Sequence, residues 1–564
     1  MNEFSDHMPL FFELNFSTIC QKRTNTTTRN YIKWETSKND EYAQMLQPHR
    51  ETLLSVVNDI TLDVDIHNAV REITRIIYDS AFKVFGHSVS INKNIDRQNR
   101  PNNEWFDENC KNARKTFHVT RNFFLRHQTE ANRSEYVIAR NSYNKVKRKA
   151  QYNFKRKKGL ELCSIAKTNP KKFWSTLKPK NKSKCVADNE AMFSYFENVL
   201  GMNPPELSDT VLDLLNNTYF DGVNIDLLDT DISEDEIIKA LKRLKSGKSA
   251  GNDEIVGEMF SSCPSFFAPI LKTLFNSIFA IGVYPENWTE CLVIPVPKSG
   301  DLTSPINYRP IILVSILSKL FTSILTDRLL SWSQDENHII DNQFGFQPGR
   351  STVDAIFTLH GIISHTLKHK LKLYCGFVDF RRAFDKVDRR ILIYKLLKSG
   401  VSSKFVSMVN SIYSSVRLRV RSGGVLSEAF DNHLGVKQGE PLSPLLFLFF
   451  INDIIQDIST DVNEDVISLN GILIYLILFA DDTVLFGKTP TVLQHLFDKL
   501  LLYCNKWNIE VNADKTKVVV FRNGFRPVDT NFTMITRNCK LLIHMCTLVY
   551  YYITTESFYI LKNV

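Results

Sequence analysis

The feature that most restricts the fold of this chain is a pair of adjacent acids, Asp481 and Asp482, between two apolar runs. Residues 472–480 are almost wholly apolar, and residues 483–486 resume an apolar strand after the pair. The pattern predicts a hairpin with two carboxylates at its tip. An ordinary tight hairpin favours Asn-Gly or Asp-Gly there, because its turn residues need positive φ. Two acids between apolar strands instead repel each other and lose hydration, and a divalent cation would offset both costs.

A third acid, Asp379, also ends a short apolar strand, residues 373–378. Downstream, Asp388 is expected to cap a helix with an apolar face that ends at Ser399-Gly400. Three acids at strand ends give the ligand set of a two-metal phosphoryl-transfer site. In such a site one metal activates the attacking 3′-hydroxyl, and the other stabilises the leaving pyrophosphate. Since an isolated Asp-Asp pair is a weak indication, the order of the surrounding segments decides the interpretation.

Several further segments occur in a fixed order around these acids: Pro295–Asp301, Asn307–Ile311, Gln343–Thr352, Gly435–Pro444 and Asn512–Lys517. Phe479-Ala480-Asp481-Asp482 resembles the (Y/F)-x-D-D box of reverse transcriptases. Phe377-Val378-Asp379-Phe380, with Ala383-Phe384-Asp385, resembles their first catalytic motif in its LINE form. Together these segments resemble the reverse transcriptases of non-LTR (LINE-type) retrotransposons. A telomerase or group II intron reverse transcriptase fits the Phe-Gly-Phe and Tyr-Arg-Pro-Ile segments less well.

The resemblance implies a metal site with two Mg²⁺ ions, for which Mn²⁺ is an alternative. Asp379 and Asp481 would bridge the two metals, the Phe380 carbonyl would be a further ligand, and Asp482 a supporting carboxylate. The implied partners are an RNA template, a DNA primer and dNTPs. The oligomeric state stays open.

The resemblance also implies a nucleotide site. Lys298 and Arg309 would hold the triphosphate, a task that suits the guanidinium fork of Arg, and Lys515 would lie near the leaving phosphate. Phe384 resembles the bulky gate that excludes a ribose 2′-hydroxyl. The alternatives are a surface ion pair for Arg309 and an ordinary core position for Phe384.

The loop around Gln438 and Gly439 would line the template and nucleotide pocket, where Gly lets the backbone come close. Here the sequence departs from the family. Glu440 stands where the family usually has a small residue or Cys, and a charge close to the pocket is expected to weaken triphosphate binding. The tail after Phe521 lacks the expected thumb pattern, which suggests truncation or a frameshift.

At the other end, Ser5-Asp6-His7-Met8-Pro9 resembles the last motif of the endonuclease domain that such elements carry upstream. Asp6 and His7 would be the remnant of acid–base machinery, and no nuclease activity is expected. Residues 10–16 alternate as a half-buried strand does, and the polar residues 17–50 predict a loop or disorder. Ile66, Val70, Ile73 and Ile77 have helical spacing. Ser233 lies in a predicted helix N-terminus, residues 231–236.

Residues 140–184 contain sixteen Lys and Arg against one acid, Glu161, with aromatic residues between them. Cations with interleaved aromatics are typical of surfaces that follow a phosphate backbone and stack on bases. The alternative is a solvated helix face, although these cations would repel one another without a polyanion. The net charge of +9 also favours a polyanionic partner. The predicted nucleic-acid-binding residues are Lys147, Arg148, Lys155, Arg156, Lys171, Lys172 and Trp174.

Other classes of protein fit less well. The ten cysteines form no C-x-x-C pair, so neither a zinc site nor a disulfide framework is indicated. The first residues lack a secretory pattern, and no apolar run reaches the roughly 20 residues of a membrane span. A nuclear or cytoplasmic protein is expected.

The sequence thus predicts an α+β right-hand polymerase, with fingers and palm, preceded by a helical basic region. The predicted divisions are an endonuclease remnant, a basic helical linker, a polymerase extension, fingers with palm, and a degenerate thumb or tail: residues 1–16, 17–230, 231–290, 291–525 and 526–564. The alternative is an inactive retrotransposon remnant that only binds RNA or DNA.

Overall fold

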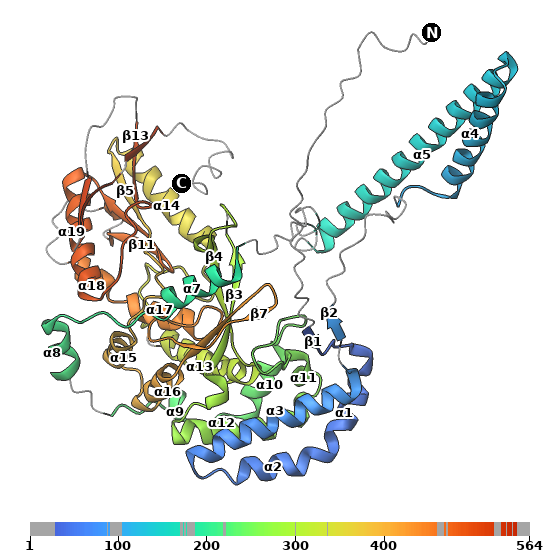
Figure 1. The fold of residues 1–564 in the computed structure, drawn as a ribbon. Coiled ribbons are helices and arrows are strands. Elements are labelled where there is room, and N and C mark those ends of the chain that lie inside the picture. The colour runs from blue at the N-terminus through green and yellow to red at the C-terminus, as the bar shows by residue number, and fades with distance from the viewer. Residues whose placement is uncertain are drawn as a thin grey trace. The chain divides into compact units, whose positions relative to one another are not determined.

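The computed structural model describes residues 29–86, 88–90, 104–169, 173, 176, 187–217, 222–298, 300–335, 337–459, 467–469, 472–523, 532–536, 539–543 and 545–549. Contacts divide the chain into two units, Met1–Ser90 with Cys185–Val564, and Ile91–Lys184. Helices and strands are mixed in the larger unit, which confirms an α+β fold (Figure 1). The predicted divisions of the chain stay predictions. The candidate residues Asp6, His7, Lys171, Lys172 and Trp174, and the strand expected at 10–16, lie outside the described residues.

The first sheet of the larger unit, here called the central sheet, has five strands. In order they are β11 (Leu476–Phe479), β12 (Asp482–Gly487), β5 (Leu373–Val378), β13 (Lys517–Arg522) and β16 (Met545–Val549). The pairs are antiparallel except β13–β16, which is parallel. Phe479 pairs with Asp482 across the β11–β12 turn, so the predicted hairpin with acids at its tip is confirmed.

Helices cover both faces of the central sheet, α14 (Thr352–Lys368) on one and α19 (Pro490–Lys506) on the other (Figure 1). This explains the apolar runs in its strands, since a sheet covered on both faces has no wet side. Gly376 in β5 permits the close approach of α19, because a Cβ there would lie 2.5 Å from the Phe497 ring.

A second sheet has the order β4–β3–β6–β7, with β8 also pairing with β6. Its strands are β3 (Glu290–Pro297), β4 (Tyr308–Leu313), β6 (Arg417–Ser422), β7 (Val425–Leu426) and β8 (Phe430–Asp431). The helix α7 (Asn189–Leu200) contacts β6. Three small pairs complete the described strands: β1 (Arg29–Tyr31) with β2 (Ser88–Ser90), β9 (Ile467–Leu469) with β10 (Ile472–Ile474), and β14 (Phe532–Thr536) with β15 (Cys539–Ile543).

Helices make up most of the rest of the larger unit. They are α1 (Asn39–Leu46), α2 (Arg50–Asn58), α3 (Asp63–Phe85), α8 (Asp209–Asn217), α9 (Asp226–Asp229), α10 (Glu234–Lys242), α11 (Gly257–Ser261), α12 (Pro264–Ile281), α13 (Ile316–Asp335), α15 (Arg389–Lys398), α16 (Ser403–Ser414), α17 (Ser443–Ile451) and α18 (Ile454–Ser459). Short 3₁₀ turns are η1 (Thr36–Lys38), η2 (Gln47–His49), η3 (Glu286–Trp288) and η4 (Pro305–Asn307).

The prediction of a loop over residues 17–50 is wrong at β1 and again from Thr36 onward, where η1, α1 and η2 form. The polar composition hides two apolar residues, Tyr42 and Leu46, which are fully buried where α1 meets α3. Tertiary burial therefore outweighs composition here. The spaced isoleucines and Val70 do lie on the buried face of α3, as predicted.

The predicted helix ends are also confirmed. Ser233 caps α10 in a capping box with Glu236, and Asp388 accepts a hydrogen bond from the Arg390 backbone N–H at the start of α15. Gly400 follows α15 with φ 84°. Glycine adopts this left-handed conformation without the steric cost of a Cβ, so it ends the helix.

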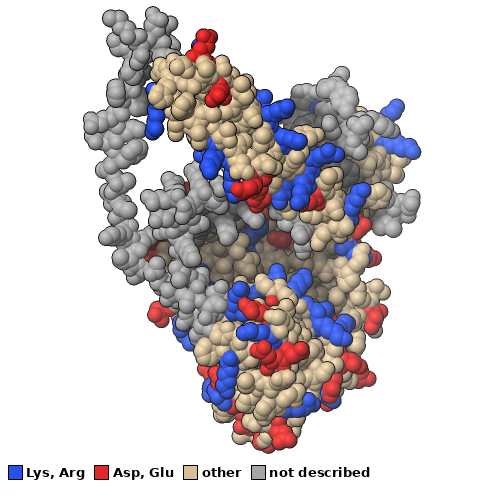
Figure 2. Space-filling view, turned by 90° about the vertical axis from the view of Figure 1, so that its right-hand side faces the viewer, with Lys and Arg blue, Asp and Glu red and all other residues tan. Residues whose placement is uncertain are grey.

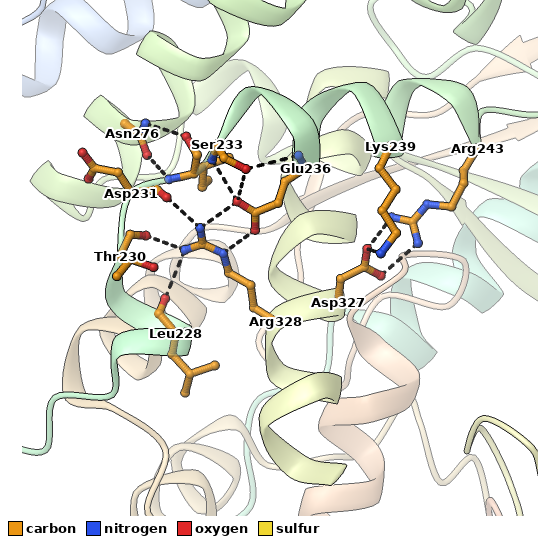
Figure 3. A network of polar contacts seen from close by, with 11 residues as sticks. Leu228, Thr230, Asp231, Ser233, Glu236, Lys239, Arg243, Asn276, Asp327 and Arg328 are labelled. Atoms are coloured by element: carbon orange, nitrogen blue, oxygen red, sulfur yellow. Dashed lines mark hydrogen bonds and ion pairs between the residues drawn. The ribbon is translucent and has the colours of Figure 1, made fainter. Parts of the chain in front are cut away.

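A network around Arg328 joins α13 to the start of α10 (Figure 3). The nearly buried guanidinium donates to both carboxylate oxygens of Glu236, at 2.7 and 3.0 Å. It also donates to the carbonyls of Leu228, Thr230 and Asp231. One side chain thus donates hydrogen bonds to the backbone carbonyls before α10 and to Glu236 of its capping box.

A second buried cation, Lys395 of α15, lies against the rings of Phe450, Tyr503 and Trp507. Its ammonium donates to the Phe450 carbonyl and to Asp453, both at 2.7 Å. Burial lowers the pKa of Lys395 to about 8, although Asp453 opposes the shift.

This pKa predicts a pH-dependent stability. Between about pH 8 and the unperturbed value near 10.5, the unfolded chain holds a proton on this side chain that the folded chain has lost. The contribution of Lys395 to stability should therefore rise with pH across that window and stay flat below pH 8. Lys395→Met should remove this contribution, so the stability of the wild type relative to this variant should rise with pH. Urea unfolding of both proteins from pH 7 to 10.5 measures it, and a constant difference between them across the window would contradict the prediction.

The helix α12 is apolar and long enough to cross a membrane by length and composition, within the part of the chain that the structure describes. Nine of its residues are buried, and it contacts α2, α3 and α10. A core helix of this kind passes the same test.

The smaller unit is a helical hairpin of α4 (Glu108–Arg126) and α5 (Glu130–Thr168). Two ring stacks join the helices, Phe117 with Tyr143 and Phe124 with Tyr136, at 5.6 and 5.7 Å between centroids. In α5 the described side chains are exposed or half-buried, except for Ala139. Lys and Arg side chains line the hairpin surface in the upper part of Figure 2. Such a helix buries little apolar surface of its own and carries its cations in solvent.

Candidate active site

The three predicted catalytic acids come together at one end of the central sheet. Asp379 directly follows β5, and Asp482 begins β12. Val378 pairs with Thr483 in the register, so the next positions on these neighbouring strands are Asp379 and Asp482. Neighbouring strands lie about 4.8 Å apart. Asp379 and Asp482, with Lys515, also line one cavity of about 550 Å³.

The electrostatics of the three acids favour a bound cation. Burial, with the neighbouring Asp379, raises the pKa of Asp481. Burial, then Asp481 and Asp379, raises the pKa of Asp482. As the side chains lie, no three His, Cys, Asp or Glu in the described ranges form a complete metal-ligand group. Mg²⁺ usually binds through one or two carboxylates together with waters and substrate phosphates. The acids therefore fit a Mg²⁺ ion whose remaining ligands are water molecules or a bound phosphate.

The turn that carries Asp481 is held by Gln343, a residue to which the sequence assigned no role. Ala480 has φ 59°, an uncommon value for a residue with a side chain. Gln343 is buried; its Oε1 accepts from the Ala480 N–H at 2.8 Å, and its Nε2 donates to the Ala480 carbonyl at 3.3 Å. Oε1 also accepts from the Gly345 N–H at 2.8 Å. The buried Gln343 amide thus stabilises a backbone conformation at Ala480 that glycine usually adopts.

The predicted triphosphate cations share one electrostatic neighbourhood. Burial lowers the pKa of Lys298, and the nearby Arg309 and Lys515 lower it further. The charge of the exposed Arg309 also opposes the rise in the pKa of Asp481. The Lys515 ammonium lies 3.8 Å from Asp379 Oδ2. These like charges are expected to favour an anion between them.

Arg382 is a fourth cation in this neighbourhood that the sequence did not single out. It stands three residues after Asp379 with φ 53°, and its guanidinium donates to the Tyr195 hydroxyl at 3.0 Å. The same guanidinium lies 5.8 Å from the centre of the Tyr195 ring. No local pattern links Tyr195 of α7 to this loop, so only the tertiary structure shows the contact.

Phe384 is half-buried and stacks on Phe447 of α17, at 4.4 Å between ring centroids. Phe346 meets its ring edge-on at 6.1 Å. Two other rings therefore contact Phe384. This geometry suits both a gate and a core position, and the gate stays a prediction. Phe380 has a buried side chain, and its backbone forms a bridge with Val511.

The loop with Gln438 and Gly439 contacts both the second sheet and residues 379–388, which are here called the acidic loop. Gln438 Nε2 donates to Asp385 at 2.6 Å, and its carbonyl accepts from the Ile312 N–H at 2.8 Å. Burial raises the pKa of Asp385 to about 6, while Gln438, Arg382 and Lys298 oppose the shift. Gly439 has φ 117°, and a Cβ there would lie 2.8 Å from the Ile312 carbonyl oxygen. Any other residue would therefore displace β4.

Glu440 is buried and not exposed beside the predicted nucleotide pocket, and its expected effect on triphosphate binding stays a prediction. The side chain is 2% exposed and turned into the core. Its Oε2 accepts from the Tyr413 hydroxyl at 2.7 Å and from the Ser443 hydroxyl at 3.2 Å. Lys437, also buried, lies over the Tyr413 ring. These hydroxyls satisfy Oε2, whereas Oε1 is buried without a hydrogen-bond partner among the described residues.

Four of the predicted nucleic-acid-binding residues lie on α5. Arg148, Lys155 and Arg156 are exposed, and Lys147 is half-buried.

Residues 296–546 match the family model "Reverse transcriptase (RNA-dependent DNA polymerase)". A probable RNA-directed DNA polymerase from transposon BS of Drosophila melanogaster is 30% identical over 295 residues, which are 50% of this chain and 32% of that protein. The RNA-directed DNA polymerase from mobile element jockey of the same species is 25% identical over 300 residues, 52% of this chain and 32% of that protein. The chain thus spans about a third of the length of these relatives.

Among solved structures, an apo telomerase from Candida tropicalis, truncated from its C-terminal domain, aligns with 51% of this chain and 67% of its own. The TM-score is 0.33 and the identity 13%. The matched residues include all three acids, the four cations Lys298, Arg309, Arg382 and Lys515, and the second sheet except most of β3. Residues 296–546 are therefore similar to the reverse transcriptase family, and both relatives are named as RNA-directed DNA polymerases of mobile elements.

Proposed function

We propose that this chain is an RNA-directed DNA polymerase that joins dNTPs to a DNA primer on an RNA template, with two Mg²⁺ ions. The central sheet would be the palm, and the second sheet part of the fingers. The observation that carries the proposal is the meeting of Asp379 with Asp481 and Asp482 at adjoining strand ends, far apart in sequence. Similarity to a family alone says nothing of whether these acids meet in this chain.

In this proposal Asp379 and Asp481 hold the metals, with the Phe380 carbonyl and Asp482 in support. The bound metals would activate the primer 3′-hydroxyl and stabilise the leaving pyrophosphate. The cations Lys298, Arg309 and Lys515 bind the triphosphate and orient it. Their mutual repulsion, which lowers the pKa of Lys298, would be relieved by the bound anion.

Four further residues would contact the nucleotide. Phe384, which contacts two other rings, would exclude the ribose 2′-hydroxyl. Gln438 and Gly439 would place backbone close to the base pair. Arg382, oriented by Tyr195, would add a fourth contact to the triphosphate.

Primer extension tests the proposal. The purified chain, an annealed RNA template and DNA primer, Mg²⁺ and dNTPs should give template-directed extension, and rNTPs should give far less. Binding of RNA without any extension would support instead the inactive remnant. Equal use of rNTPs would contradict the gate but not the polymerase.

We also propose that the α4–α5 hairpin binds the RNA backbone. Replacing Lys147, Arg148, Lys155 and Arg156 by Gln should weaken RNA binding. It should also make the slope of log K against log salt shallower, by about 0.7 for each lost phosphate contact on single strands. Fluorescence anisotropy with a labelled RNA, from 50 to 200 mM salt, measures both.

A matched control removes the same charge elsewhere. Gln at Lys33, Arg71, Arg75 and Lys83, exposed cations of the larger unit, should leave the salt slope nearly unchanged. Equal losses in both variants would show that net charge alone governs binding, and would contradict a specific role for the hairpin.

A further inference from the structure

The turn at residues 510–516 grips the loop that carries Asp379. Asn512 contacts Asp379 twice: its backbone N–H donates to the Asp379 carbonyl at 2.8 Å, and its Nδ2 donates to Oδ2 at 2.8 Å. We infer that Asn512 is a positioning residue that fixes the Asp379 carboxylate for the metal. This inference rests on the proposed function. It states that Asn512 raises the metal affinity of the site by orienting Asp379.

The turn is itself firmly attached to the acidic loop. Val511 bridges Phe380, and the Arg381 N–H donates to the Glu510 carbonyl at 2.7 Å. Arg381 and Lys386 both form ion pairs with the Glu510 carboxylate. The backbone that carries Asn512 therefore has little freedom relative to Asp379, and its amide is held in place before any ligand binds.

Thr516, at the end of the same turn, is fully buried and also contacts Asp379. Its hydroxyl donates to the Asn512 carbonyl at 2.9 Å and lies 3.4 Å from the Asp379 backbone N–H, from which it accepts. Asp379 is thus contacted at its N–H, its carbonyl and its carboxylate by one short segment. The contacts reach across 133 to 137 residues of sequence.

The chemical consequence concerns the two carboxylate oxygens. The terminal torsion of an Asp side chain is broad, so an unsupported carboxylate rotates and offers either oxygen to a metal. Here Asn512 donates a hydrogen bond to Oδ2, and the Lys515 ammonium lies 3.8 Å from the same oxygen. This arrangement leaves Oδ1 available to a metal in a fixed direction. Loss of such a partner to a ligating carboxylate typically costs 10- to 100-fold in metal affinity or activity.

The test measures metal binding directly, without turnover. The wild-type chain is bound to a template with a chain-terminated primer and the matching dNTP, and Mn²⁺ binding is followed by electron paramagnetic resonance. Asn512→Leu, which has a similar size but no side-chain N–H donor, should raise the Kd for Mn²⁺ by about 10-fold. It should raise by a similar factor the Mg²⁺ concentration that half-saturates primer extension.

Controls separate positioning from folding. Asn410→Leu, at an exposed Asn of α16, should bind Mn²⁺ as the wild type does. Asn512→Ser, whose hydroxyl is too short to reach Oδ2, should also weaken binding and keeps the inference testable if the Leu variant unfolds. A thermal melt by circular dichroism identifies the variants that fold.

The outcomes distinguish this inference from the proposed function. A wild type that binds Mn²⁺ and extends primers, with folded Asn512 variants that bind Mn²⁺ equally well, overturns the positioning role alone. A wild type that neither binds Mn²⁺ in the complex nor extends a primer overturns the proposed function, and the role of Asn512 falls with it.

Discussion

Asp481→Asn should abolish primer extension, with a fall in kcat of at least about 10³-fold, equivalent to roughly 4 kcal/mol of lost transition-state stabilisation. Asn keeps the shape of the side chain, and the backbone bonds of Ala480 to Gln343 hold the turn, so the fold should survive. What is lost is a charge that burial and Asp379 already destabilise and that a cation would stabilise. Single-turnover primer extension measures the effect.

The matched control is Asp498→Asn, at an exposed position of α19, which should extend primers at the wild-type rate. RNA binding should be equal in the wild type and both variants. Extension by Asp481→Asn at more than about a tenth of the wild-type rate would remove Asp481 from the reaction, because a metal ligand contributes several kcal/mol.

Arg328→Met should lower the free energy of unfolding of the larger unit by about 3 kcal/mol. Breaking a buried ion pair costs roughly 3–5 kcal/mol, and the lower end applies because Glu236 keeps a third of its side chain exposed. Met fills much of the space but removes the guanidinium that donates to three carbonyls and to the Glu236 carboxylate (Figure 3). Urea unfolding followed by circular dichroism measures the loss.

The neighbouring Arg243 offers a contrast. It pairs with Asp327 at 2.6 Å, but both side chains are substantially exposed. Arg243→Met should therefore cost less than about 1 kcal/mol. If the two variants lose the same stability, burial of the Arg328 guanidinium does not carry the effect, and the account of this network is wrong.

The sequence by itself determined the features that depend on neighbouring residues. Apolar runs on either side of Asp481 and Asp482 predicted the hairpin, and Ser233 and Asp388 predicted two helix starts, because strand pairing at a tight turn and helix capping act over a few residues. The order of the motifs predicted the family, which the match over residues 296–546 confirmed.

Only the tertiary structure decided which distant residues support those motifs. Asn512 holds Asp379, Gln343 holds Ala480 and Tyr195 holds Arg382, and none of these pairs is close in sequence. Likewise, the burial of Glu440 and the helix α1 depended on partners that composition does not reveal. A hydrogen bond or a buried surface belongs to two segments at once, and a local pattern describes only one of them.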